Sequence, residues 1–198
     1  MAIEIAEIKR LRGLTGVGMT DAKRALEVAN GDFDKALSEM RKKGLTKAEK
    51  KGEREAREGL IEGYVHSGRI GVIVEVNCET DFVTRTEDFK SLAHDIAMHI
   101  AALAPDYVSI DDVPKEIREK TMIEFREKAK AEGKPDAMLD KLVDGMVKKH
   151  FSEKCLLDQA FIKNPDQTVG NYVQESIAKL GENIVVRRFS RMALGEIS

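Results

Sequence analysis

The chain has no tryptophan, and its other aromatic residues are few: seven Phe and three Tyr among 198 residues. Proteins that bind single-stranded nucleic acid stack the bases on aromatic side chains, and this chain has a poor supply of them. Its charges are nearly balanced, with 33 basic and 35 acidic residues, whereas nucleic-acid-binding domains usually carry a basic excess. Both features argue against a nucleic-acid partner and are compatible with a protein that binds another protein.

Cysteine is also scarce. Cys78 and Cys155 are the only two, so the sequence contains neither a disulfide framework nor a zinc-finger pattern. We expect both to be buried as small hydrophobic residues in a reducing compartment. No run approaches the ~20 apolar residues of a membrane-spanning helix, and the first residues lack the basic and apolar regions of a signal peptide. A cytoplasmic protein without membrane contact is therefore expected.

Motifs for binding nucleotides or for chemical catalysis are missing as well. The sequence has no G-x-x-x-x-G-K-[S/T] loop and no Gly-rich dinucleotide fingerprint after a strand. His94 and His99 lie about 140° apart around a helix, which is not the one-face arrangement of a zinc-binding helix. Cys78 has no recognisable activating base with an orienting group, and the two carboxylates of Glu79 and Asp81 alone make a poor metal site. We expect no cofactor, no metal and no chemical active site.

The N-terminal part of the chain carries the pattern of three short helices. Apolar residues recur there at helical spacing in three segments, which we expect to end at Gly13, at Asn30-Gly31 and at Gly44. Residues 41–58 follow with eight basic and four acidic residues, which predicts a solvated helical linker; contact with nucleic acid is the less favoured interpretation. We place a domain boundary near residue 55, between an N-terminal module (1–55) and a core domain (56–198).

After Gly59 the pattern changes to an alternation of period two. It continues to His66, Ser67-Gly68 has the composition of a turn, and Ile70–Asn77 reads as the return strand of a hairpin. Apolar residues at helical spacing then predict a helix of about four turns that Pro105 stops. These residues are Phe89, Leu92, Ala93, Ile96, Ala97, Ile100 and Leu103.

Two amphipathic segments come next, and they start at Pro114 and at Asp136 with a strong break, Gly133-Lys134-Pro135, between them. They predict an antiparallel helical hairpin over residues 114–151. The remaining pattern predicts a strand near 156–162, a helix between Thr168 and Gly181, and a last strand over 182–191. Because strands and helices do not alternate regularly, the predicted fold class is α+β with a mainly antiparallel sheet.

The residues Thr80-Asp81-Phe82-Val83 lie at the junction between the return strand and the next helix. Such junctions are often surface loops held by rigid elements, and binding residues concentrate in them. Phe82 has two interpretations at this stage. It is either a core residue beneath the loop or a side chain that inserts into a partner.

The segment Asn77–Val83, with the sequence NCETDFV, resembles the signature of the elongation factor Ts family. Three further segments are similar to that family and occur in the same order: Leu14–Leu26, His94–Ala102 and Gly181–Arg188. Together the four segments span nearly the whole chain, which makes the resemblance specific. The length is closer to the compact form of the family than to the longer form, whose core is internally duplicated.

This resemblance implies a guanine nucleotide exchange factor that binds elongation factor Tu and carries no cofactor. It implies an N-terminal bundle similar to the ubiquitin-associated fold, and a helical hairpin that protrudes from the core. Compact members of the family tend to form homodimers that bind two partner molecules.

The resemblance also implies which residues contact the partner. In the family the loop that corresponds to Thr80, Asp81, Phe82 and Val83 enters the GTPase domain, disturbs the magnesium and phosphate site of bound GDP, and uses Phe82 as a wedge. The N-terminal contact strip corresponds to Leu14, Val17, Gly18 and Met19. The core helix faces a second region of the partner, where Met98 and His99 are the expected contacts.

Two other hypotheses stay open from the sequence. One is a small enzyme that uses Asp81, His99 or Cys78, and the missing nucleophile arrangement weighs against it. The other is an adaptor whose N-terminal bundle binds ubiquitin-like or RNA partners, and it is weakened because the bundle is only a small part of the chain.

Overall fold

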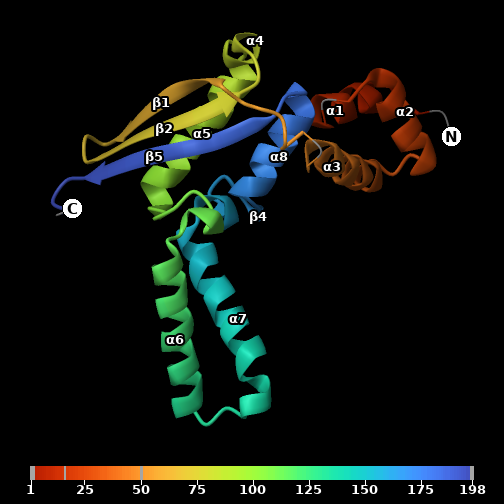
Figure 1. Cartoon of the computed structure of the whole chain (residues 1–198). Helices are drawn as coiled ribbons and strands as arrows, with labels where there is room; N and C mark the ends of the chain where they lie inside the picture. Colours follow the sequence, from red (N-terminus) through yellow and green to blue (C-terminus); the bar gives the residue numbers. More distant parts are fainter. Residues whose placement is uncertain (1–2, 16, 50, 197–198) are drawn as a thin grey trace.

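The structure is a computed structural model that describes residues 3–15, 17–49 and 51–196. A three-stranded antiparallel sheet is packed against helices on one face, a group of three helices lies at one end, and two long helices extend away as a hairpin (Figure 1). The predicted α+β class with a mainly antiparallel sheet is confirmed. Gly16, and Lys50 of the predicted linker, lie outside the described residues.

The N-terminal helices are α1 (Ile5–Thr15), α2 (Met19–Val28) and α3 (Phe33–Glu49). They share a hydrophobic cluster whose innermost side chains are Leu11, Ala22, Leu26 and Ala36. The predicted stop after α2 is present: Asn30 and Gly31 both have positive φ, and the Gly31 N–H bonds back to the Leu26 carbonyl at 2.8 Å. Asp32 then caps α3 through a bond from the Lys35 N–H.

Two of the predicted helix ends are wrong. Helix α1 continues past Gly13 to Thr15, and α3 continues past Gly44 to Glu49. Glycine costs about 1 kcal/mol in a helix interior, and at Gly44 tertiary packing offsets that cost. A Cβ atom at Gly44 would lie 3.2 Å from Cβ of Ala178, on α8 (Val169–Leu180). Gly44 therefore lets α3 approach α8 closely, and the first part of the predicted helical linker is a continuation of α3.

The sheet contains β1 (Glu58–His66), β2 (Ile70–Cys78) and β5 (Ile184–Ala193) in the order β1-β2-β5. The predicted hairpin is confirmed, and its turn residues Ser67 and Gly68 both have positive φ, the conformation that matches the twist of the two strands. The last strand starts and ends two residues later than the predicted span of 182–191.

The main core lies between the sheet and the helices α5 (Glu87–Leu103) and α8. Val72, Val74 and Val76 alternate along β2 and face inward, where Phe89, Leu92 and Ile96 of α5 are fully buried. Thr86 caps α5 by accepting a hydrogen bond from the Phe89 N–H. Both predicted ends of α8 are confirmed: Thr168 caps its N-terminus, and Gly181 ends it with a φ of 83°.

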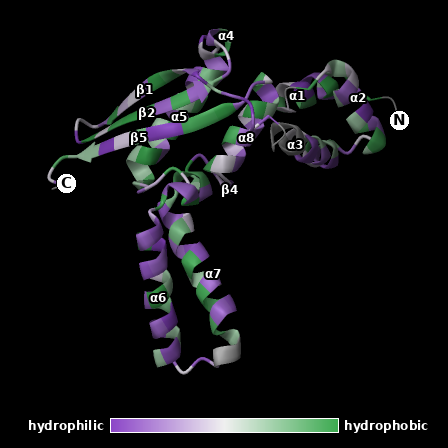
Figure 2. Cartoon of the chain, in the orientation of Figure 1, coloured by the Kyte–Doolittle hydropathy of each residue, from purple (hydrophilic) through white to green (hydrophobic). Residues whose placement is uncertain are grey.

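The helical hairpin is confirmed, and its helices are α6 (Lys115–Ala131) and α7 (Asp136–Lys154). Hydrophobic and hydrophilic residues alternate along both helices (Figure 2), and Ala129, Leu139 and Val143 are buried in the hairpin. A small cluster of Val113, Phe151 and Cys155 lies at its base.

Short elements connect the hairpin to the rest of the fold. They are the 3-10 turns η1 (Ile110–Asp112) and η2 (Leu156–Asp158), and the two strands β3 (Ala160–Phe161) and β4 (Asn164–Thr168). The predicted strand near 156–162 is thus mostly a turn followed by a two-residue strand. None of the described helices is long and apolar enough to cross a membrane.

Candidate functional site

The junction after β2 forms a four-residue helix, α4 (Asp81–Thr84), which projects at the top of the molecule in Figure 1. The Phe82 side chain is 76% exposed, whereas the neighbouring Val83 is half-buried and packs against the main core. These positions exclude the interpretation of Phe82 as a core residue beneath the loop, and its insertion into a partner stays a prediction. Phe82 is a surface residue and not part of the core.

Within α4 the Asp81 carboxylate is bound by its own helix neighbour. The Arg85 guanidinium donates to Asp81 Oδ2 at 2.6 Å, and the Thr84 hydroxyl donates to the Asp81 carbonyl at 2.6 Å. Asp81 also lies in the first turn of α4, where the helix dipole stabilises a negative charge. An exposed ion pair contributes only about 0–1 kcal/mol, so these bonds shape α4 without securing it to the fold.

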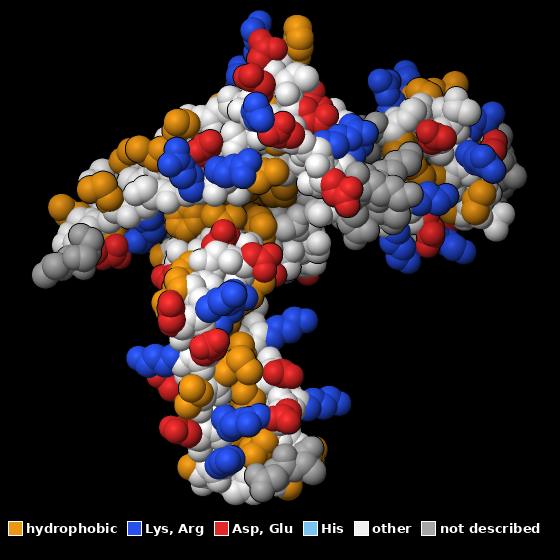
Figure 3. Space-filling model, viewed as in Figure 1, with side chains coloured by type: hydrophobic (Ala, Val, Ile, Leu, Met, Phe, Trp, Pro, Cys, Tyr) orange, Lys and Arg blue, Asp and Glu red, His pale blue; other side chains and the backbone are white. Residues whose placement is uncertain are grey.

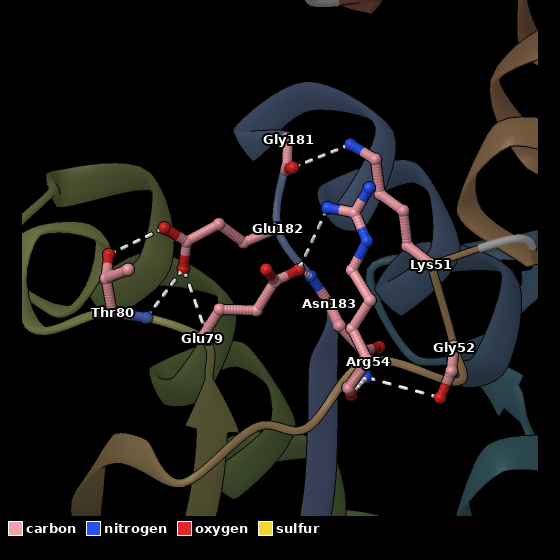
Figure 4. A network of polar contacts seen from close by, with 8 residues as sticks. All are labelled: Lys51, Gly52, Arg54, Glu79, Thr80, Gly181, Glu182 and Asn183. Atoms are coloured by element: carbon pink, nitrogen blue, oxygen red, sulfur yellow. Dashed lines mark hydrogen bonds and ion pairs between the residues drawn. The ribbon is translucent and has the colours of Figure 1, made fainter.

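The base of α4 is secured by Glu182, which lies between α8 and β5 (Figure 4). Its Oε2 atom accepts hydrogen bonds from the Thr80 N–H at 3.0 Å and from the Glu79 N–H at 3.2 Å. Its Oε1 atom accepts a third from the Thr80 hydroxyl at 2.6 Å. One carboxylate therefore binds two consecutive residues that lead directly into α4.

A second set of bonds ties the same turn to the segment that follows α3. Glu79 accepts a hydrogen bond from the Asn183 N–H at 2.6 Å and pairs with Arg54 at 3.6 Å. The Asn183 amide group donates to the carbonyls of Arg54 at 2.6 Å and Gly52 at 3.3 Å. The arrangement in Figure 4 thus joins three parts of the chain that are far apart in sequence.

Sequence reasoning missed the roles of Glu182, Asn183 and Arg54. Glu182 and Asn183 occur in one of the family-like segments, but no spacing or periodicity connects them to Thr80, which lies about a hundred residues earlier. A carboxylate directly after a helix-ending glycine was the only local signal. It indicates a turn, and it does not indicate what the turn contacts.

The N-terminal residues of interest lie where α1 meets α2. Leu14 is 51% exposed, Met19 is exposed at the start of α2, and Gly18 is exposed as the N-cap residue of that helix. Val17 is half-buried and packs against the cluster of the bundle. Leu14, Gly18 and Met19 are therefore available to a partner, while Val17 also serves the bundle.

On α5 the structure corrects one expected contact. His99 is 0% exposed, so its side chain is not available on the surface, and we withdraw it from the contact residues. The cause is its position on the inward side of α5, where its ring lies next to Phe161. Met98, one position away around the helix, is half-buried.

The bonds to His99 define its neutral form. The Ile162 N–H donates to Nδ1 at 3.2 Å, so the ring proton is on Nε2, which faces the Gln159 carbonyl oxygen at 2.9 Å. The Gln159 amide nitrogen donates in turn to the Glu153 carbonyl, which fixes this orientation. Burial lowers the pKa of His99, against a smaller opposite effect of the Gln159 bond.

The thiols do not form a reactive centre. Cys78 is fully buried and its Sγ–H donates to the Thr80 carbonyl at 3.1 Å. Burial, together with the nearby charge of Glu182, raises the pKa of Cys78 to about 11, and burial likewise raises the pKa of Cys155 to about 11. A nucleophilic cysteine needs a lowered pKa. Among the described residues no group of three or more His, Cys, Asp or Glu is arranged to hold a metal ion.

An exposed hydrophobic side chain on a surface turn held by rigid elements is typical of a binding site. Comparison with known proteins gives the class more closely. The family model described as elongation factor TS matches residues 44–196.

Relatives from several bacteria match over nearly the full length. Elongation factor Ts of Carboxydothermus hydrogenoformans is 56% identical over 190 residues, which cover 96% of this chain and 88% of that protein. Elongation factor Ts of Moorella thermoacetica is 51% identical over 195 residues, which cover 98% of this chain and 96% of that protein. The chain therefore belongs to the elongation factor Ts family. Its general role is that of a nucleotide exchange factor, and not of a catalyst of a chemical reaction.

Proposed function

We propose that the chain binds elongation factor Tu in its GDP-bound form and promotes release of GDP by inserting α4 next to the nucleotide site. The exposed Phe82 at the tip of α4 is the observation that carries this proposal. A large apolar side chain that points away from its own core is buried only when a partner covers it. Burying a Phe contributes about 1.5–3 kcal/mol to the free energy of binding.

The proposed mechanism acts on the partner's magnesium and phosphate site. GTPases hold GDP largely through Mg²⁺ and through backbone amides around the phosphates, so displacing these elements weakens nucleotide binding. Phe82 is the wedge, Asp81 contributes charge beside it, and Thr80 and Val83 set the geometry of the turn. The factor itself binds neither GDP nor magnesium.

Completion of the exchange follows from thermodynamic linkage. If the factor lowers the affinity of the partner for nucleotide, nucleotide lowers the affinity of the partner for the factor by the same ratio. Binding of GTP therefore displaces the factor. We place this cycle in the cytoplasm, without a nucleic-acid or membrane partner.

Two further surfaces contribute to binding in this proposal. Residues 1–55 form a docking module for the GTPase domain, and Leu14, Gly18 and Met19, with Val17 behind them, are its contact strip. The accessible side of α5, including Met98, faces a second region of the partner. Two separate contacts orient α4 relative to the nucleotide site.

We also propose that two copies of the chain pair through the open face of the sheet. An antiparallel sheet with one face in solvent usually carries polar residues on it, but here several exposed apolar residues share that face with Ser190 and the Glu75–Arg188 ion pair. Ile61, Val65, Ile73 and Met192 of the sheet, and Leu194 just beyond it, are between 58% and 75% exposed. Figure 3 shows hydrophobic side chains along this part of the molecule. Such a patch is self-complementary in a two-fold dimer.

The deciding experiment is release of a fluorescent GDP analogue from elongation factor Tu, followed by stopped flow at saturating factor. Loss of an interface anchor costs about 2–4 kcal/mol, so Phe82→Ala is expected to slow assisted release by roughly 30-fold or more. Ile123→Ala, which removes an exposed apolar side chain from α6, is the matched control and is expected to release GDP at the wild-type rate. A folded Phe82→Ala protein with wild-type exchange would refute the wedge.

A further inference from the structure

We propose that Glu182 is a positioning residue for exchange: its carboxylate holds α4 in the orientation that presents Phe82. This inference rests on the proposed role of Phe82. It adds a residue from a different part of the chain, the turn between α8 and β5, to the elements that release the nucleotide.

The first argument is that α4 lacks the usual means of stabilising itself. Its four residues make barely one helical turn, and isolated helices below ~12 residues are marginal in water. None of its side chains is fully buried, and Val83 is the residue of α4 that packs against the main core. Apart from this Val83 contact, we attribute the orientation of α4 to the bonds at its base.

The second argument is that the capping residue is diverted to Glu182. Thr80 is the N-cap of α4, where a hydroxyl normally accepts a bond from the first turn of its helix, yet it makes no such bond here. Its hydroxyl donates instead to Glu182 Oε1 at 2.6 Å, and its N–H donates to Oε2 at 3.0 Å. Bonds to an ionised acceptor are roughly twice as strong as bonds between neutral groups. The Thr80 hydroxyl thus bonds to Glu182, in another part of the fold, in place of a capping bond within α4.

The third argument concerns how Glu182 is itself held. It follows Gly181, whose φ of 83° ends α8, and it lies two residues before Ile184, the first residue of β5, so a rigid element lies close on each side of it. The Asn183 N–H is bound by Glu79 at 2.6 Å, which makes the contact between residues 79–80 and 182–183 reciprocal. A carboxylate held in this way fixes the start of α4 relative to the turn between α8 and β5.

The same turn also fixes the segment that leads from the N-terminal helices. Lys51 Nζ donates to the Gly181 carbonyl at 2.6 Å, and the Asn183 side chain donates to the Arg54 carbonyl at 2.6 Å. The attachment of the N-terminal module and the attachment of α4 therefore meet at residues 181–183. A partner that contacts both surfaces meets them in a set relative orientation.

The test uses the full-length protein and two readouts. Glu182→Gln keeps the size of the side chain but removes its charge and replaces one of its two acceptor oxygens by a donor. At saturating factor we expect assisted GDP release to slow about tenfold. Glu124→Gln, which removes an exposed carboxylate from α6 where it pairs with Lys120, is the matched control and is expected to keep the wild-type rate.

The second readout does not depend on the partner. Because the chain has no tryptophan, Phe82→Trp places a single fluorophore on α4, and its time-resolved anisotropy reports the local motion of that helix. We expect larger-amplitude fast motion when Glu182→Gln is added, with little change in Tm. Wild-type exchange by Glu182→Gln, or unchanged Trp motion, overturns the positioning role.

Two further variants separate the possible failures. Thr80→Val removes only the hydroxyl donor, and if it acts through the same contact, its effect on release is not additive with that of Glu182→Gln. Additive effects contradict a shared contact and count against the proposal. Phe82→Ala in the same assay tests the wedge alone: wild-type release by that variant refutes the proposed function, while the Trp anisotropy still decides whether Glu182 holds α4.

Discussion

The Asn183 N–H donates to the carboxylate of Glu79, and the carboxylate of the adjacent Glu182 accepts from the Glu79 N–H in return. Each of these two short segments, one after β2 and one after α8, thus donates a backbone N–H to a carboxylate of the other. The contact lies directly before α4, the helix that carries Phe82. It explains how a turn with so little buried surface keeps one geometry.

Asp81→Ala is expected to slow assisted GDP release by less than Phe82→Ala does, by about three- to tenfold. The Asp81 carboxylate is half-exposed and bound to Arg85. The substitution therefore removes a screened surface charge, whereas Phe82→Ala removes a side chain that the partner buries. The measurement is stopped-flow release at saturating factor. Arg85→Ala separates the two roles of Asp81: it removes the ion pair and keeps the carboxylate. An Asp81→Ala protein that is slower than Phe82→Ala would show that charge, and not the wedge, dominates release.

The paired substitution Leu14→Ser and Met19→Ser is expected to weaken binding to elongation factor Tu by about tenfold or more while the protein stays folded. Both side chains are exposed at the junction of α1 and α2, so the hydrophobic cluster of the bundle is left intact. Titration calorimetry measures the affinity, and circular dichroism checks the fold. Val28→Ser, which changes an exposed apolar residue at the end of α2, is the control. Equal affinities for all three proteins would exclude this strip from the interface.

The free energy of unfolding is expected to fall as the pH drops below about 6.5, the usual pKa of His, because burial lowers the pKa of His99 in the folded state. In that range the unfolded chain takes up a proton at His99 that the folded chain does not, and stability is lost as the pH falls. A protonated ring would also place a second donor opposite the Ile162 N–H.

Urea unfolding at pH 7.5, 6.5 and 5.5 measures this dependence. His99→Gln removes the titrating group, so its stability is expected to be lower at pH 7.5 but to change less steeply with pH. The same slope in both proteins would mean that other groups cause the pH dependence.

Ile73→Lys is expected to convert a dimer into a monomer. Ile73 lies on β2, the central strand, and is exposed on the open face of the sheet, so the new charge would be buried unpaired in a dimer that uses this face. Sedimentation velocity of both proteins at several concentrations measures the change. Ile123→Lys, on the exposed side of α6, is the control and is expected to sediment as the wild type does. A wild-type protein that is monomeric throughout would disprove pairing through the sheet.

Local sequence was sufficient for several features that depend on neighbouring residues. The Ser67-Gly68 turn, the Asn30-Gly31 stop, the Thr168 cap and the Gly181 helix end were all predicted, because each depends on the conformational range or hydrogen bonding of one or two residues. The helical spacing of apolar residues likewise predicted α5 and the two helices of the hairpin, α6 and α7. The family was already indicated by short ordered segments, of which Asn77–Val83 was the most informative.

Tertiary structure alone decided the features that depend on what lies opposite a residue. Gly44 reads as a helix end, but it lies inside α3 because α8 packs against it. His99 reads as a possible contact, but its side of α5 faces the interior. Phe82 had two interpretations from its local pattern, the resemblance favoured contact with a partner, and the fold excludes the core interpretation because the side chain is exposed.

Glu182 is the clearest case. Its chemistry is visible in the sequence, but its function depends on two hydrogen-bond donors at Thr80 and one at Glu79 that only the folded chain brings within reach. Periodicity and turn chemistry act over a few residues, so the sequence by itself determined the elements and the family. Contacts between distant residues form when the whole core packs, and therefore only the tertiary structure decided how α4 is held.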